Sequence, residues 1–259
     1  MKKEKHSKPP QSRNFVINIL IIICIIVIIF SLYNIGSWFI ENKKGTDLIS
    51  NIQSQVTITS EDISVNNLNV KKLNYDFTNL LSENSRTVGW VNVKNTNINY
   101  PVVKYTNNDY YLNHSFDNTE NSAGWIFADY QNQCDGSDYN TVIYGHNRKD
   151  KSMFGSLKNV LKSDWYSNED NLYINFSTLN ESHVYKIFST IICNEKDVGA
   201  YTKTQFTDDT DFSNYIQMLN NSSNHNFKTD ISETSHIITL YTCHGLNNQR
   251  LLVYATLVE

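Results

Sequence analysis

The sequence predicts a mainly β domain, a sandwich or barrel of eight short strands, preceded by a single transmembrane helix. Three observations support this fold class: short runs rich in β-branched and aromatic residues, turn signals between them, and one long aliphatic stretch near the N-terminus. Asn95-Thr96-Asn97, Asp135-Gly136-Ser137 and Asn180-Glu181 are examples of the turn signals. The expected strands are residues 89–93, 98–103, 125–128, 141–144, 172–176, 183–192, 235–242 and 250–258.

The aliphatic stretch over residues 15–40 predicts a membrane-spanning helix, because about 20 apolar residues suffice to cross a bilayer. A cleaved signal peptide is the competing interpretation, but its apolar region usually has about 7 to 15 residues and ends in small side chains. Tyr33, Trp38 and Phe39 are large instead. Since basic residues precede the stretch, we expect residues 1–14 to form a cytoplasmic basic tail, residues 15–40 a cell-membrane anchor, and the rest to lie outside the cell.

The exported part is acidic. Of the 22 Lys and Arg and 26 Asp and Glu residues, seven and two lie in residues 1–44, which leaves 15 basic and 24 acidic side chains, a net charge of −9, beyond them. Nucleic acids and polyanionic wall polymers favour clustered Lys and Arg. The charge therefore argues against a nucleic-acid partner, and a length of about 215 residues suits one domain.

Four cysteines are too few for a disulfide scaffold in a chain of this size. Cys24 lies inside the aliphatic stretch, which leaves Cys134, Cys193 and Cys243 outside the membrane. Whether Cys134 and Cys193 form a disulfide is left open, because the sequence gives no distance between them. An odd cysteine is either reactive or intermolecular, and Cys243 is the one that most needs an explanation.

Helices are expected at three places in the exported part. Residues 45–85 are polar and predict a stalk followed by a helix near residues 70–81. Apolar residues at helical spacing predict a second helix at 153–161 and a third at 211–219, the latter with Thr210 or Asp211 as its cap. The third helix lies in the long link between Cys193 and Ser235, and a link of this length in a compact domain is usually functional or mobile.

Cys243 ends one apolar run and Arg250 opens the next, with a short polar turn between them. If the turn closes a hairpin, the two residues lie opposite each other on one face of the sheet. A neighbouring cation lowers the pKa of a thiol and favours the nucleophilic thiolate. The competing interpretation is a small buried cysteine near a solvated arginine.

His146 is the best candidate for the base that a nucleophilic cysteine usually needs. It follows the expected strand 141–144 and Gly145, where a strand end presents side chains to a groove. His244 would face away from Cys243 by strand alternation, and His236 lies about 23 Å back along an extended strand. The remaining histidines, His6, His114, His183 and His225, fit ordinary surface or capped positions.

Together these residues resemble the sortases, the membrane-anchored cysteine transpeptidases of Gram-positive bacteria. The resemblance runs from about Thr87 to the C-terminus and points to class B, as does the expected helix in the long link. The motifs that carry it are Thr239-Leu240-Tyr241-Thr242-Cys243 with Arg250, Tyr144-Gly145-His146-Asn147, Ser152-Met153-Phe154-Gly155-Ser156-Leu157, Thr87-Val88-Gly89-Trp90, Asn97-Ile98-Asn99-Tyr100-Pro101-Val102-Val103 and Asp109-Tyr110-Tyr111-Leu112-Asn113.

The resemblance implies an eight-stranded sortase-type β-barrel over residues 86–259, behind a stalk and N-terminal helical segment at 41–85. It implies that Cys243 is the nucleophile that cleaves a C-terminal sorting motif after Thr, that His146 is the acid and then the base, and that Arg250 is the oxyanion donor. The implied partners are exported proteins with a sorting signal and an amine of peptidoglycan or of a lipid-linked precursor. Asn108, Leu112, Tyr241 and Thr242 are the implied substrate contacts.

Two positions depart from the class B pattern. Tyr241 stands where a small hydroxylated residue is frequent, which predicts a narrower, more aromatic groove, and His244 stands where an acidic residue is frequent. The sequence leaves three alternatives open: an exported Cys/His hydrolase, an L,D-transpeptidase, and a non-catalytic wall-binding β-domain. No cofactor is expected and no metal site, because His and Cys lack the paired spacing of zinc sites and Asp208-Asp209-Thr210-Asp211 is typical of solvated surface.

Overall fold

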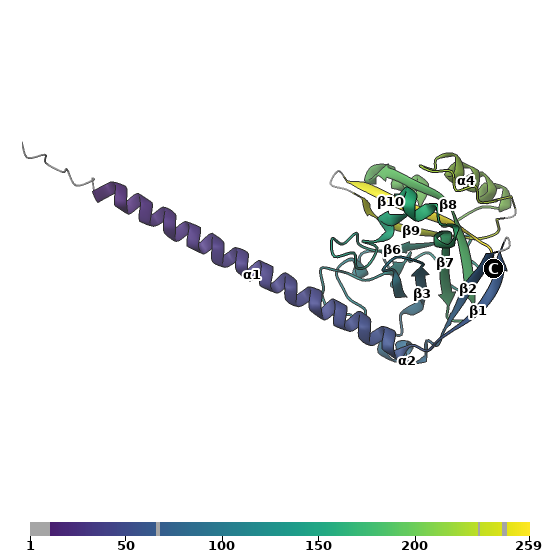
Figure 1. Cartoon of the computed structure of the whole chain (residues 1–259), viewed down its shortest axis with the longest axis horizontal. Helices are drawn as coiled ribbons and strands as arrows, with labels where there is room; N and C mark the ends of the chain where they lie inside the picture. The colour runs from purple at the N-terminus through teal and green to yellow at the C-terminus, as the bar shows by residue number, and fades with distance from the viewer. Residues whose placement is uncertain (1–10, 66–67, 233, 245–247) are drawn as a thin grey trace, which may run out of the picture. The chain divides into compact units, whose positions relative to one another are not determined.

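The computed structural model describes residues 11–65, 68–232, 234–244 and 248–259. The chain divides into two compact units, Met1–Asp47 and Leu48–Glu259. Helix α1, Gln11–Gln55, is one continuous helix (Figure 1). Its part Phe15–Gln55 is long and apolar enough to cross a membrane, with a mean hydropathy of 3.3 in its most apolar window. The domain boundaries expected at residues 41 and 86 stay predictions.

The second unit is built on a closed barrel with the strand order β10-β8-β7-β3-β4-β5-β6-β9. Neighbouring strands are antiparallel except at β4–β5 and β6–β9, which are parallel. The eight strands expected from the sequence are confirmed, with small shifts at their ends. They are β3 Thr87–Val93, β4 Asn99–Lys104, β5 Phe127–Ala128, β6 Asn140–Tyr144, β7 Tyr173–Thr178, β8 Ser182–Asn194, β9 Ile237–His244 and β10 Gln249–Leu257.

The barrel closes around one large apolar core. Trp90, Trp125 and Phe154 are among its largest fully buried side chains, and the last turn of α1 adds Ile52 to the same core. Because β-branched and aromatic side chains pack well on a pleated, half-buried surface, the runs that predicted strands also supply the interior. The barrel is therefore a well-packed scaffold for the side chains at its rim.

The prediction of a helix near residues 70–81 is wrong over the first half of this range. The structure has a hairpin there, β1 Ile58–Val65 and β2 Leu68–Tyr75, followed by a short helix α2, Thr78–Glu83. Strand β2 pairs with β1 along its whole length. Two side chains of β7 also bind its backbone: the N–H of Leu73 donates to Asn175 Oδ1 at 3.0 Å, and Ser177 Oγ donates to the carbonyl of Leu73 at 2.9 Å. Tyr75 also stacks on Trp90.

The helix expected at 153–161 is confirmed only at its end. A 3-10 helix, η2, covers Leu157–Leu161. Met153 instead has a φ of 50° and forms an isolated β-bridge with Asn147. A side chain at Gly155 would collide with the carbonyl of Arg148, so the chain before η2 folds back as a tight loop rather than as a helical turn. Four short helices were not expected: η1 Tyr110–Leu112, α3 Ser163–Tyr166, η3 Glu169–Leu172 and η4 Glu195–Tyr201.

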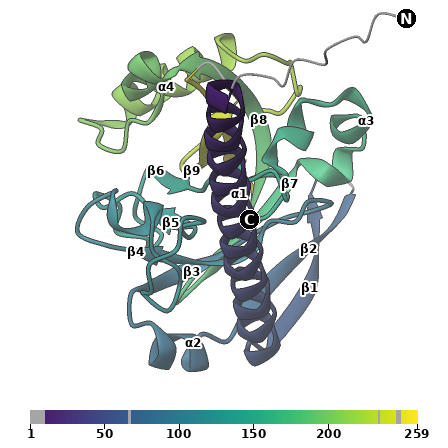
Figure 2. The same ribbon diagram turned by 90° about the vertical axis from the view of Figure 1, so that its left-hand side faces the viewer.

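The helix expected at 211–219 is confirmed as α4, Asp209–Asn221. Its cap is Asp208, whose carboxylate accepts from the N–H of Asp211 at 2.8 Å, and not Thr210 or Asp211. Its apolar face packs with residues of β8 and β10, including Phe188 and Tyr254, in a second core cluster outside the barrel. Figures 1 and 2 show α4 and α2 at opposite ends of the barrel.

Candidate active site

The strands β9 and β10 form the predicted hairpin, and their register pairs Arg250 with Cys243. The expected opposition of these two residues is therefore confirmed for the backbone. The side chains of Cys243 and His244 lie outside the described part of the structure. On its other side β10 pairs with β8, and there Arg250 is opposite Cys193. Cys134 and Cys193 are both free, so the disulfide left open between them is absent.

The guanidinium of Arg250 is largely buried, with 14% of its side chain exposed, and it is held from several directions. Its Nε donates to the hydroxyl of Tyr241 at 2.9 Å, and its Nη1 donates to the carbonyl of Gln249 at 3.1 Å. Its Nη2 forms an ion pair with Glu195 Oε1 at 2.6 Å. Glu195 is the first residue of η4, so the long link before the cysteine strand reaches the arginine.

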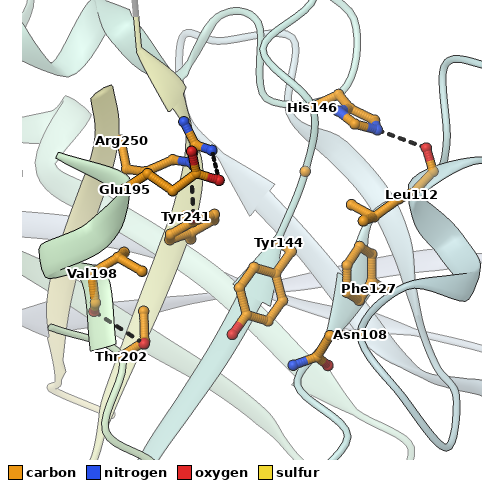
Figure 3. Close-up of a pocket in the computed structure, with 11 residues that line it drawn as sticks. Asn108, Leu112, Phe127, Tyr144, His146, Glu195, Val198, Thr202, Tyr241 and Arg250 are labelled. Atoms are coloured by element: carbon orange, nitrogen blue, oxygen red, sulfur yellow. Dashed lines mark hydrogen bonds and ion pairs between the residues drawn. The ribbon is translucent and has the colours of Figure 1, made fainter. Parts of the chain in front are cut away.

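His146 follows β6, and its side chain points toward Leu112, the last residue of η1 (Figure 3). Its Nε2 lies 2.7 Å from the carbonyl oxygen of Leu112. A carbonyl only accepts hydrogen bonds, so Nε2 is a protonated nitrogen that donates to it. Gly124, at a φ of +58°, allows this approach: a Cβ there would lie 2.8 Å from the Leu112 oxygen and 2.9 Å from the imidazole Cδ2.

A pocket of about 430 Å³ connects these residues. Figure 3 shows Arg250 and Glu195, with Tyr241 beside them, on one side of it, His146 with Leu112 on the other, and Tyr144 between the two sides. The pocket is lined by Asn108, Leu112, Phe127, Tyr144, Gly145, His146, Glu195, Val198, Thr202, Tyr241 and Arg250. Five residues expected from the sequence thus meet at one cavity, namely Asn108, Leu112, Tyr241, His146 and Arg250.

Thr242 is the described member of the expected set that does not line the pocket. Its side chain is buried, with 2% of the residue exposed, and its hydroxyl donates to the carbonyl of Gly145 at 2.7 Å. Because alternate residues of a strand face opposite sides, Thr242 turns away from the side that Tyr241 occupies. It ties β9 to the chain segment that carries His146.

A buried carboxylate organises one wall of the pocket. Asp129, 5% exposed, accepts from the Tyr144 hydroxyl at 2.7 Å and from Asn108 Nδ2 at 2.8 Å. Burial, and then the charge of Asp129, raise the pKa of Tyr144 far above its usual value, so its phenol stays protonated and donates. The ring of Tyr144 meets Phe127 and, edge to face at 5.0 Å, Tyr241.

Six pocket residues were missed by reasoning from the sequence: Phe127, Tyr144, Gly145, Glu195, Val198 and Thr202. Tyr144 stood inside a recognised motif, and the last three lie in the link that was expected to be functional because of its length. No local pattern marked Glu195 itself. Within the described residues, no group of three or more His, Cys, Asp and Glu is arranged to hold a metal ion.

Comparisons with known proteins show which family the chain is similar to. The family model described as a sortase domain matches residues 91–258. The chain is 32% identical to sortase B of Listeria monocytogenes, over 89% of this chain and 91% of that protein. It is 28% identical to sortase B of Staphylococcus aureus, over 95% and 98% of the two chains.

Solved structures show the same likeness. The crystal structure of sortase B from Bacillus anthracis in complex with AAEK1 aligns with a TM-score of 0.70 and 29% identity, over 85% of this chain and 99% of that chain. The Staphylococcus aureus sortase B–substrate complex aligns with a TM-score of 0.64 and 30% identity, over 71% and 84%.

Proposed function

The chain belongs to the sortase family as a class B sortase, a cysteine transpeptidase, and we propose that Cys243, His146 and Arg250 carry its reaction. The observation that most supports this assignment is the pocket that His146 and Arg250 share, with Arg250 in register with Cys243. The family also implies that its substrates are exported proteins with a sorting signal.

In the first half-reaction, the thiolate of Cys243 attacks the carbonyl carbon of the scissile threonine. Arg250 donates hydrogen bonds to the oxyanion, and its guanidinium suits this role because it keeps its charge and holds several donors in a fixed fork. His146 gives a proton to the departing amine as the tetrahedral intermediate collapses. The products are a thioacyl enzyme and the free C-terminal fragment.

In the second half-reaction, an amine attacks the thioester and Cys243 leaves as thiolate. His146, now neutral, takes the proton that the amine loses. The Nε2–H of His146 is engaged by the Leu112 carbonyl, so we assign the transferred proton to Nδ1. We propose that the amine belongs to peptidoglycan or to a lipid-linked precursor of it.

The substrate groove is proposed to follow the pocket wall formed by Asn108, Leu112 and Tyr241. The ring of Tyr241 narrows the groove at this wall, where it packs edge to face against Tyr144. Thr242 is proposed to act indirectly, through its bond to Gly145. Equal turnover of a panel of sorting peptides by Tyr241→Ser and by the parent would count against the narrowed groove.

Helix α1 is proposed to anchor the enzyme in the cell membrane as a single-pass segment. Five basic residues precede residue 15, namely Lys2, Lys3, Lys5, Lys8 and Arg13, and such residues favour the cytoplasmic side. The N-terminus would then be cytoplasmic and the catalytic unit would lie outside, where exported substrates and wall amines are found.

The test is to incubate the full chain, purified in detergent, with a degenerate library of sorting-type peptides and a wall-type amine such as triglycine. We expect cleavage after Thr and formation of the amide-exchanged product. Cys243→Ala, His146→Ala and Arg250→Ala should each lower turnover by at least about 100-fold. Cys134→Ser and His225→Ala, a thiol and an imidazole outside the pocket, serve as matched controls. An active Cys243→Ala, or products of hydrolysis alone from unrelated peptides, would overturn the assignment.

A further inference from the structure

The hydrogen bonds of Arg250 show how its orientation is set. A guanidinium has five N–H donors in a rigid plane, and three of them have acceptors from separate places: Tyr241 on β9, Gln249 on β10 and Glu195 on η4. Contacts at Nε, Nη1 and Nη2 together determine both the position and the rotation of the plane. An arginine held at one nitrogen alone could still turn about its long side chain.

The two side-chain acceptors are themselves held in place. The backbone N–H of Glu195 donates to the carbonyl of Asn248 at 2.9 Å, which joins the start of η4 to the start of β10. The ring of Tyr241 packs against Tyr144, whose hydroxyl is bound to the buried Asp129. Both side chains that accept from Arg250 are therefore fixed by contacts with residues of the barrel or directly next to it.

The burial of the two charges differs. The side chain of Arg250 is 14% exposed, whereas that of Glu195 is 57% exposed. A cation with so little access to water needs a partner, while solvent screens the charge of an exposed carboxylate. Glu195 can thus neutralise the charge of Arg250, while solvent screening keeps its carboxylate from strongly repelling an oxyanion in the pocket.

We propose that Glu195 and Tyr241 are positioning residues that hold the guanidinium of Arg250 ready to receive the oxyanion. This inference rests on the proposed function of Arg250 as oxyanion donor. Donors that are already oriented stabilise charge in the transition state without the cost of reorganisation, so the two residues act on the rate of the chemical step. The inference also gives the long link a role, since it supplies Glu195 from outside the catalytic strands.

The experiment uses the full chain and the peptide that the parent cleaves best in the library. Tyr241→Phe removes only the hydroxyl that Arg250 Nε contacts, and Glu195→Gln removes only the charge. We expect each variant to lower kcat about tenfold and to leave KM within about twofold, because an interaction made in the transition state alone changes kcat. Asp197→Asn, an exposed acid on the same helix η4, is the matched control and should keep the parental kcat.

Crystal structures of the variants provide a readout that does not depend on activity. In Tyr241→Phe and Glu195→Gln we expect the Arg250 guanidinium to be displaced or to occupy more than one orientation, with the barrel unchanged. Parental kcat in both variants would overturn the inference, as would a change in KM alone or a lowered kcat with Arg250 in its parental place. Failure of the proposed function is distinguished from these outcomes by activity that survives in Arg250→Ala.

Discussion

At the scale of single residues, the orientation of His146 depends on a glycine from another part of the chain. Gly124 lies beneath the imidazole and beside the carbonyls of Tyr111 and Leu112, at a φ that side chains rarely adopt. The strand end before His146 was recognisable in the sequence, because an apolar run stopped there. The contact with Gly124 was not, since it joins residues 22 positions apart through the fold.

Gly124→Ala should therefore lower both stability and activity. A Cβ would meet the Tyr111 oxygen at 2.6 Å and the His146 ring at 2.9 Å, and a positive φ costs a side chain about 1–2 kcal/mol. We expect the free energy of unfolding to fall by about 2 kcal/mol or more and kcat to fall at least about tenfold. Urea unfolding and peptide cleavage measure the two effects.

The control for this variant is Gly199→Ala, because a Cβ at Gly199 meets nothing within 4 Å. It should retain parental stability to within about 0.5 kcal/mol. Parental activity in Gly124→Ala would show that the orientation of the His146 imidazole does not depend on its close approach to Gly124.

The thiols differ in their expected reactivity. Burial, followed by the charge of Asp138, raises the pKa of the Cys134 thiol to about 12, and burial also raises the pKa of Cys193. A raised pKa leaves a thiol protonated at neutral pH, and the thiolate is the reactive form. Iodoacetamide at neutral pH should therefore modify Cys243, the proposed thiolate, before either of them.

Peptide mapping by mass spectrometry would follow each cysteine separately in the full chain. As the pH rises, labelling of Cys134 should increase only well above neutrality. Faster labelling of Cys134 than of Cys243 at neutral pH would contradict the proposed thiolate.

At the scale of elements, the hairpin β1–β2 shows how tertiary contacts override a local expectation. Polar sequence with scattered apolar residues suggested a stalk and a helix, yet β2 lies beside β7 (Figure 2). The polar side chains of Asn175 and Ser177 on β7 bind the backbone of Leu73. Local periodicity does not reveal a strand whose backbone is bound by the side chains of another strand.

Asn175→Ala should loosen this hairpin. The substitution leaves the N–H of Leu73 without its acceptor in a part-buried setting, and a lost partner of this kind costs about 1–3 kcal/mol. Urea unfolding should show a loss of that order. Asn69→Ala, at an exposed position of β2, should change stability by no more than about 0.5 kcal/mol. Equal losses in the two variants would mean that Asn175 is not what holds β2.

At the scale of the whole molecule, family membership replaces the alternatives that the sequence left open. A hydrolase, an L,D-transpeptidase and a non-catalytic wall-binding domain each accounted for part of the residue pattern. The sortase domain match extends over residues 91–258, and relatives of the same class align over most of the chain. The membrane anchor and its orientation remain proposals.

The topology can be tested on protoplasts of cells that produce the full chain with a tag at each end. If α1 spans the membrane with its N-terminus inside, added protease should remove the C-terminal tag and leave the N-terminal tag intact. Permeabilised protoplasts, in which both tags should be lost, are the control. Protection of the C-terminal tag in sealed protoplasts would reverse the proposed orientation.

The sequence by itself determined the eight barrel strands, the apolar segment and the pairing of Cys243 with Arg250. These features depend on local pattern: alternation within a run, turn residues between runs, and the length of an aliphatic stretch. The tertiary structure decided what surrounds the pair. Glu195 and Tyr144 line the pocket, and Gly124 lies against His146. The three residues come from separate segments, and closure of the barrel brings them together through contacts that no local pattern encodes.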